Sequence, residues 1–139
     1  MGNRACVYSV EAPGKGVYLY SHWDGDCLPM VVQSALRRGQ DRWDDSPYLT
    51  RIILSEMLRG HEMETTGYGI SAEVIDDCVP HIVVDSAGQT IGFANPCEEP
   101  KTYVAWTFDA FLECTEDEVT KAYWKHNNST WLERLERTL

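Results

Sequence analysis

The chain has 139 residues, 43% of them hydrophobic and 24% charged, which is ordinary for a single globular domain over residues 1–139. Its 22 acidic residues against 12 basic ones give a formal charge of −10, which nucleic acid repels, so direct DNA or RNA binding is not expected. No apolar run approaches the roughly 20 residues that span a bilayer, and the N-terminus lacks a signal-peptide pattern, so we expect a cytoplasmic protein that does not bind membranes.

The first part of the chain predicts a β-hairpin. Two runs rich in valine and tyrosine flank the turn-forming residues 12–16. In the second run, the alternation of side chains along a strand places Tyr18, Tyr20 and His22 on one face. The run ends in His-Trp-Asp-Gly-Asp, and we expect a corner there that leads into a helix, with Asp26 as its cap.

Two helices are expected next, over residues 26–39 and 46–60, because both segments repeat apolar residues at helical spacing. The second begins with Ser46 as the predicted N-cap and a proline in the first turn. Glu56 falls on its apolar face, so that carboxylate must be paired, hydrogen-bonded or at the margin of the core. The other residues of this face are Leu49, Ile52, Ile53 and Met57.

The remaining elements are strands followed by helices. We expect a short strand within residues 66–75, a hairpin with strands at His81–Asp85 and Thr90–Phe93, and a strand over residues 102–113. Capping boxes at 115–118 and 130–133 predict two C-terminal helices. Segregated strands and helices indicate the α+β class, as an antiparallel β-sheet with helices packed on one face.

The residues at the corner suggest metal binding or acid–base chemistry. His22, Asp24 and Asp26 are competent ligands, but their spacing fits no standard zinc or calcium loop. The 5 cysteines form no Cys-x-x-Cys pair, so we expect no metal and no cofactor. A pairing of His22 with Glu56 would suit a general base and its orienting partner. The favoured interpretation is structural: His22 forms a hydrogen bond with a backbone group or with Glu56 and stabilises the corner.

Aromatic and basic side chains suggest a small-ligand site. Indole and phenol rings can stack on a nucleobase, and the arginines of the segment Arg-Arg-Gly-Gln-Asp-Arg-Trp can bind phosphate. The competing interpretation is that these arginines complement a helix C-terminus and pair with neighbouring aspartates. The candidate residues are Tyr20, His22, Trp23, Arg38, Arg42, Trp43 and Glu56.

The acidic residues suggest a protein-binding surface. They can present negative charge to a basic partner, such as the nucleic-acid groove of another protein. Ordinary solubility and a solvated helix N-terminus are the alternative explanations. The candidate residues are Glu98, Glu99, Glu113, Glu116, Asp117 and Glu118.

The segment over residues 17–85 has a pattern that is similar to one found in other proteins. A strand ending in Tyr-x-His-Trp-x-Gly is followed by an Arg-Trp-x-Asp turn and a helix with Ile-x-x-Ser-Glu-Met. This pattern resembles a group of small uncharacterised proteins encoded by phages, prophages and some bacteria. The resemblance implies a mobile-element origin and assigns no catalytic residues. Small acidic phage proteins frequently inhibit host defence, which is an analogy of context.

The leading expectation is therefore a phage or mobile-element binding protein in the cytoplasm of a bacterial host. It would inhibit a defence system, as anti-CRISPR proteins do, through contact with a host defence protein or complex. One alternative is a nucleotide-binding sponge that sequesters a defence signalling molecule. Another is a small hydrolase or transferase that uses His22 and Glu56. The sequence leaves open whether the protein is a monomer or a homodimer.

Overall fold

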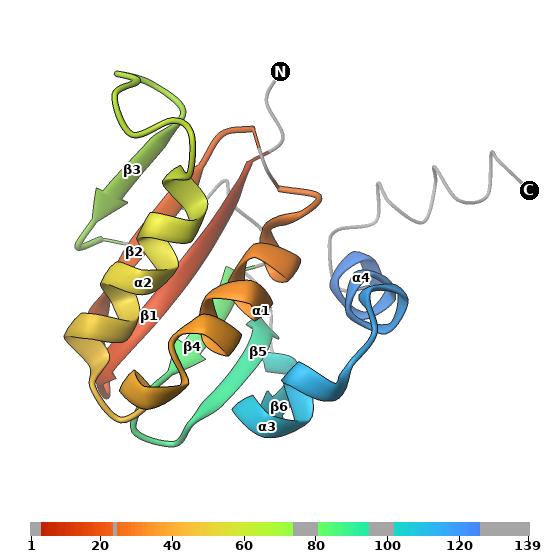
Figure 1. Ribbon diagram of the computed structural model, residues 1–139. Coiled ribbons are helices and arrows are strands. Elements are labelled where there is room, and N and C mark those ends of the chain that lie inside the picture. Colours follow the sequence, from red (N-terminus) through yellow and green to blue (C-terminus); the bar gives the residue numbers. More distant parts are fainter. Residues whose placement is uncertain (1–3, 24, 74–80, 95–101, 126–139) are drawn as a thin grey trace, which may run out of the picture.

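The structure is a computed structural model that describes residues 4–23, 25–73, 81–94 and 102–125 (Figure 1). The helices are α1 (Leu28–Arg38), the short 3₁₀ helix η1 (Gln40–Arg42), α2 (Ser46–Leu58), α3 (Phe108–Glu113) and α4 (Glu116–Lys125). The strands are β1 (Ala5–Ala12), β2 (Lys15–Ser21), β3 (Tyr68–Ser71), β4 (His81–Asp85), β5 (Thr90–Ala94) and β6 (Thr102–Thr107). This composition confirms the predicted α+β class.

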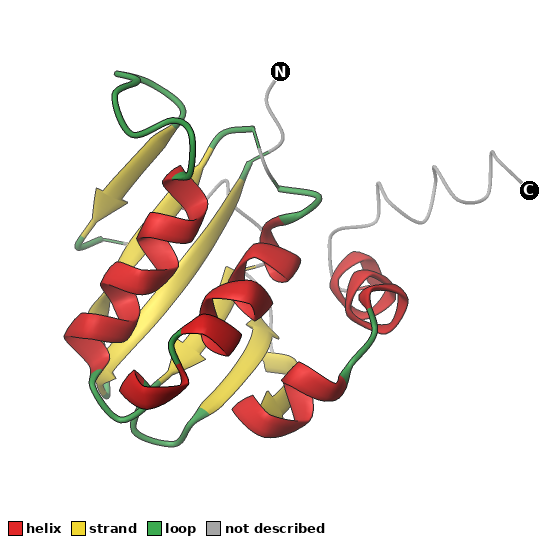
Figure 2. Cartoon of the chain, viewed as in Figure 1, coloured by secondary structure: helices red, strands yellow, loops and turns green. Residues whose placement is uncertain are grey.

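The strands form one sheet in the order β3-β2-β1-β4-β5-β6. Neighbouring strands are antiparallel except for the central pair β1 and β4, which run parallel. A parallel pair needs a long crossover connection, and here that connection contains both α1 and α2. Figure 2 shows that the helices lie on one side of the sheet, as the sequence predicted.

The core lies between this side of the sheet and the helices. Alternate residues of the strands point inward, so that Val7, Leu19, Ile82 and Phe93 are at most 1% exposed. The helices contribute the predicted apolar faces, and Glu56 is the charged residue placed beside them. The fully buried helix residues include Leu28, Val32, Leu36, Leu49, Ile53, Phe108 and Phe111.

Two predicted helix caps are wrong by one residue. Cys27, and not Asp26, occupies the N-cap of α1, and it makes no side-chain capping bond. Asp45 is the N-cap of α2, where its carboxylate accepts a hydrogen bond from the Tyr48 amide. Ser46 is already helical, because the change to helical backbone angles follows Asp45, whose φ and ψ are −122° and 89°.

The predicted strand over residues 102–113 is only half a strand. It ends at Thr107, whose hydroxyl caps α3 by accepting from the Ala110 amide at 3.1 Å. Phe108 and Phe111 then share the buried face of a helix instead of alternating along a strand. The capping box at Thr115 is confirmed by reciprocal bonds with Glu118 of 3.0 and 3.2 Å. The second box, at 130–133, lies outside the described residues.

Candidate functional site

The corner at the end of β2 holds the first group of candidate residues. The Tyr20 hydroxyl and His22 Nδ1 are 2.8 Å apart, which confirms that the two side chains share a face. The His22 amide donates to the Gly67 carbonyl at 2.8 Å, so the pairing of β2 with β3 extends by one residue. The His22 ring meets the Trp23 indole edge-on, with ring centroids 4.3 Å apart. The imidazole of His22 thus bonds the Tyr20 hydroxyl, whereas its structural interpretation named a backbone group or Glu56 as the partner.

Gly67 makes room for Trp23, and sequence reasoning gave it no role. Its φ of +96° is accessible mainly to glycine, and a Cβ there would lie 2.5 Å from the Trp23 Nε1 atom. The indole consequently lies against the backbone of Gly67 while remaining 57% exposed. The signal in the sequence was the pair of glycines around Tyr68, which marked only a weak strand. This corner presents an exposed aromatic ring on a fixed support.

Glu56 is held by two arginines. Its Oε1 atom accepts hydrogen bonds of 2.8 Å from both Arg38 and Arg59, and its side chain is only 9% exposed. Arg38 also donates to the Ile52 carbonyl and to the Ser55 hydroxyl. Of the three alternatives expected for this carboxylate, the structure shows pairing. The bridge ties the C-terminal end of α1 to α2, and a ligand would have to compete with it for Arg38.

The turn at η1 has mainly structural contacts. Trp43 Nε1 donates to the Leu36 carbonyl at 2.8 Å, and its ring packs edge-on against Phe108. The Ser86 hydroxyl donates to the Trp43 carbonyl, which joins the turn to the end of β4. The Arg42 guanidinium lies 4.9 Å from the centre of the Tyr48 ring, a cation–π contact that the sequence did not predict.

The two tryptophans lie at opposite ends of the sheet. Trp23 follows Ser21, which pairs with Ala5 at the start of β1. Trp43 is bonded to Ser86, which follows Asp85, and Asp85 pairs with Val10 near the end of β1. The described residues therefore do not gather the seven ligand-binding candidates into one pocket. They form a corner, an ion-paired bridge and a packed turn, and His22 and Glu56 each have other hydrogen-bond partners.

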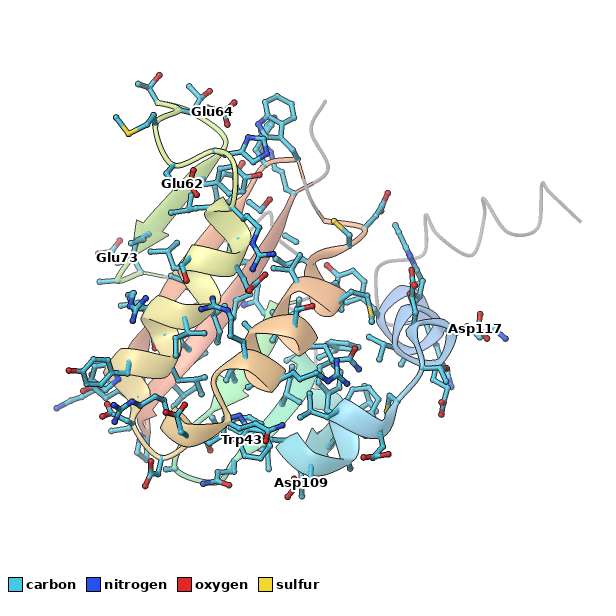
Figure 3. The ribbon with its side chains drawn as sticks, in the orientation of Figure 1. Trp43, Glu62, Glu64, Glu73, Asp109 and Asp117 are labelled. Carbon is cyan, nitrogen blue, oxygen red and sulfur yellow. The ribbon has the colours of Figure 1, made fainter. Side chains whose placement is uncertain are left out.

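The acidic candidates gather on α3 and α4. Glu113, Glu116, Asp117 and Glu118 are all exposed, although Asp117 pairs with Lys121 at 3.1 Å. The backbone amide and hydroxyl of Thr115 lower the pKa of Glu118, because both stabilise its ionised form. Asp109, in the first turn of α3, adds a further exposed carboxylate (Figure 3). Glu98 and Glu99 lie outside the described residues.

An apolar groove beside β3 is the feature that sequence reasoning missed. It has a volume of about 300 Å³ and is lined by Leu54, Leu58, Tyr68, Gly69 and Ile70. The signal was present in α2, because Leu54 and Leu58 are apolar residues outside the predicted core face. Ile70 is 60% exposed, so the apolar surface of the groove is accessible to solvent.

The described residues contain no group of three histidine, cysteine, aspartate or glutamate side chains arranged to hold a metal ion. Asp24, one of the candidate ligands, lies outside them. Their helices include none with the length and apolar character needed to cross a bilayer. Comparison of the chain with protein-family models, with curated proteins and with solved structures gives no match.

Proposed function

We propose that this protein is a non-catalytic binding protein of a phage or mobile element that inhibits a bacterial defence system by protein–protein contact. The observation that carries the proposal is the acidic surface on α3 and α4. It comprises Asp109, Glu113, Glu116, Asp117 and Glu118, all exposed. Carboxylates on these short adjoining helices act together, since the Debye length is about 8 Å at physiological ionic strength. Such a surface attracts and orients a basic partner.

The partner that fits is a nucleic-acid-binding protein of the defence system. Its groove carries lysine and arginine side chains that neutralise phosphates. An acidic surface can occupy that groove in place of nucleic acid, and the formal charge of −10 adds long-range attraction. The resemblance to phage-encoded proteins supports the same choice of partner.

The contacts of the arginines favour this function over phosphate binding. Arg38 is bonded to Glu56, and Arg42 lies over the Tyr48 ring. A phosphate ligand would have to displace these partners. On the acidic surface, Asp109, Glu113 and Glu116 are exposed, while Asp117 pairs with Lys121 and Glu118 bonds the Thr115 amide.

Size exclusion with purified defence nucleases tests the proposal. We expect a stable complex with one such nuclease, and loss of DNA binding by that nuclease when the protein is in excess. The double variant Glu113→Lys/Glu116→Lys should weaken the complex by about tenfold or more, because it reverses two charges on the acidic surface. Glu11→Lys is a single-charge control at an exposed site of β1. Nucleases that keep full DNA binding at saturating protein would contradict the proposal.

A further inference from the structure

The outward edge of β3 is arranged to accept another strand. Among the described strands, β3 and β6 are the two edge strands of the sheet, and β3 lies next to β2. The bond from the His22 amide to the Gly67 carbonyl makes Gly67 and His22 a hydrogen-bonded pair in the antiparallel ladder. Because such pairs alternate along a ladder, Gly69 and Ser71 bond to β2, whereas the N–H and C=O of Ile70 point away from it.

The groove beside this edge is apolar and accessible. Ile70 pairs with the buried Leu19, so its side chain lies on the helix-covered side of the sheet. There it faces the half-buried Leu54 and Leu58 of α2 across the groove. A strand added beside β3 would place alternate side chains on this same side of the sheet. One of them would then enter the groove and cover Ile70.

Carboxylates flank both ends of β3. Glu62 and Glu64 precede the strand and Glu73 follows it (Figure 3), and all three are exposed. Glu62 accepts a hydrogen bond from the Gly60 amide, and bonds of this kind lower its pKa and keep it ionised. Glu64 contacts the His61 ring at 2.5 Å, whereas Arg51 is a single exposed cation on α2 and Arg59 is held by Glu56. The rim of the groove is therefore negative.

The charge of this rim selects the kind of partner. If two copies of the chain paired antiparallel through β3, Glu73 of one copy would approach the segment holding Glu62 and Glu64 of the other. Like charges at such positions destabilise strand pairing. A strand carrying lysine or arginine on either side of an apolar residue would instead meet opposite charge at both ends and fill the groove at its centre.

We propose that the edge of β3 binds an extended segment of a partner protein, an apolar residue flanked by basic residues, as an added strand. This inference rests on the proposed function and names a way in which the basic partner is held.

A labelled peptide tests the inference directly. The probe is a fluorescein-labelled peptide of alternating valine and lysine residues, and binding is measured by fluorescence anisotropy. We expect saturable binding that a matched peptide of valine and glutamate does not show. Ile70→Pro removes the outward N–H without removing a bond to β2, so it should weaken binding by about tenfold. Ile70→Val keeps the N–H and an apolar side chain, and should bind as the wild type does.

Several results would overturn the inference. Equal affinities of the proline and valine variants would exclude strand addition, provided that circular dichroism shows both folded. If the proline variant does not fold, Ile70→Lys replaces it, because a cation in the groove repels the probe and should cause a similar loss. Equal binding of the glutamate peptide would exclude the role of the acidic rim. Self-association that is lost in Ile70→Lys would show that the occupant is a second copy of the chain.

The outcome is separable from that of the proposed function. A nuclease complex that survives Ile70→Pro but is lost in Glu113→Lys/Glu116→Lys would overturn strand addition and leave the proposed function in place. Capture of the peptide at β3, without a complex with any defence nuclease, would overturn the proposed function and leave the peptide site.

Discussion

The corner at Trp23 and the turn at Trp43 contain the same kind of residue in opposite situations. Trp23 lies against Gly67 with its indole 57% exposed. Trp43 donates its Nε1 hydrogen to the Leu36 carbonyl and packs its ring on the buried Phe108. An indole whose polar atom is bonded within the fold fills space and joins elements, whereas an exposed indole is accessible to another molecule. The sequence placed both in one candidate site, and their contacts assign them different roles.

The largest expected effect is on stability. Trp43→Ala should lower the free energy of unfolding by about 3 kcal/mol, because it leaves a cavity beside Phe108 and removes the bond to Leu36. Trp23→Ala should cost less than about 1 kcal/mol, since most of that indole faces solvent. Urea denaturation monitored by circular dichroism measures both. Equal losses of unfolding free energy in the two variants would show that the turn and the corner do not differ in this way.

Gly67→Ala should cost about 2 kcal/mol, from its positive φ and from the collision of the new Cβ with the Trp23 indole. The double variant Gly67→Ala/Trp23→Ala should recover the part due to the collision. The remainder is the backbone strain alone. Strictly additive losses in this double-mutant cycle would mean that Trp23 does not rest on Gly67.

A smaller effect is expected from the hydroxyl groups that serve the two regions. Ser86→Ala removes the bond to the Trp43 carbonyl and should cost about 1 kcal/mol. Tyr20→Phe removes the contact with His22 at the corner and should cost about half as much, because water can replace the hydroxyl there. Urea midpoints of the two variants should therefore fall in that order.

The smallest effect is a dependence on pH confined to the segment that leads into β3 and supports the corner. The backbone amides of Glu62 and Gly60 lower the pKa of Glu62 in the folded state, so its stabilising effect is present above the pKa of the unfolded chain. That effect is lost as the pH falls from the ordinary range of a glutamate through the lowered folded pKa. Amide exchange in residues 60–67 should accelerate in this window. Glu62→Gln should remove the change, and exchange in residues 40–43 should not show it.

Short-range patterns accounted for much of the fold. The hairpin of β1 and β2, the bounds of β4 and the apolar faces of the first two helices follow from periodicities within single segments. Residues 102–113 show the limit of such patterns. Aromatic residues spaced along this segment satisfy a strand, and the helical cap at Thr107 could be recognised only after the strand was known to end there.

The features of the candidate sites also divide into those that the sequence predicted and those that it did not. The shared face of Tyr20 and His22 and the place of Glu56 on the apolar face of α2 were predictable, because each depends on the spacing of residues within one element. The partners Arg38 and Arg59 could not be chosen from the sequence, since several basic residues were equally available. The groove at Ile70 was missed because it exists only between α2 and β3.

The sequence by itself determined the α+β class, the order of most elements and the acidity that governs the proposed partner. The tertiary structure decided that β1 and β4 run side by side in parallel, which separates Trp23 from Trp43 by the length of the sheet. It also left Ile70 at an accessible strand edge. Periodicity shows which face of a single helix or strand is buried. Which distant strands pair depends on the arrangement that buries the apolar faces of all the elements together.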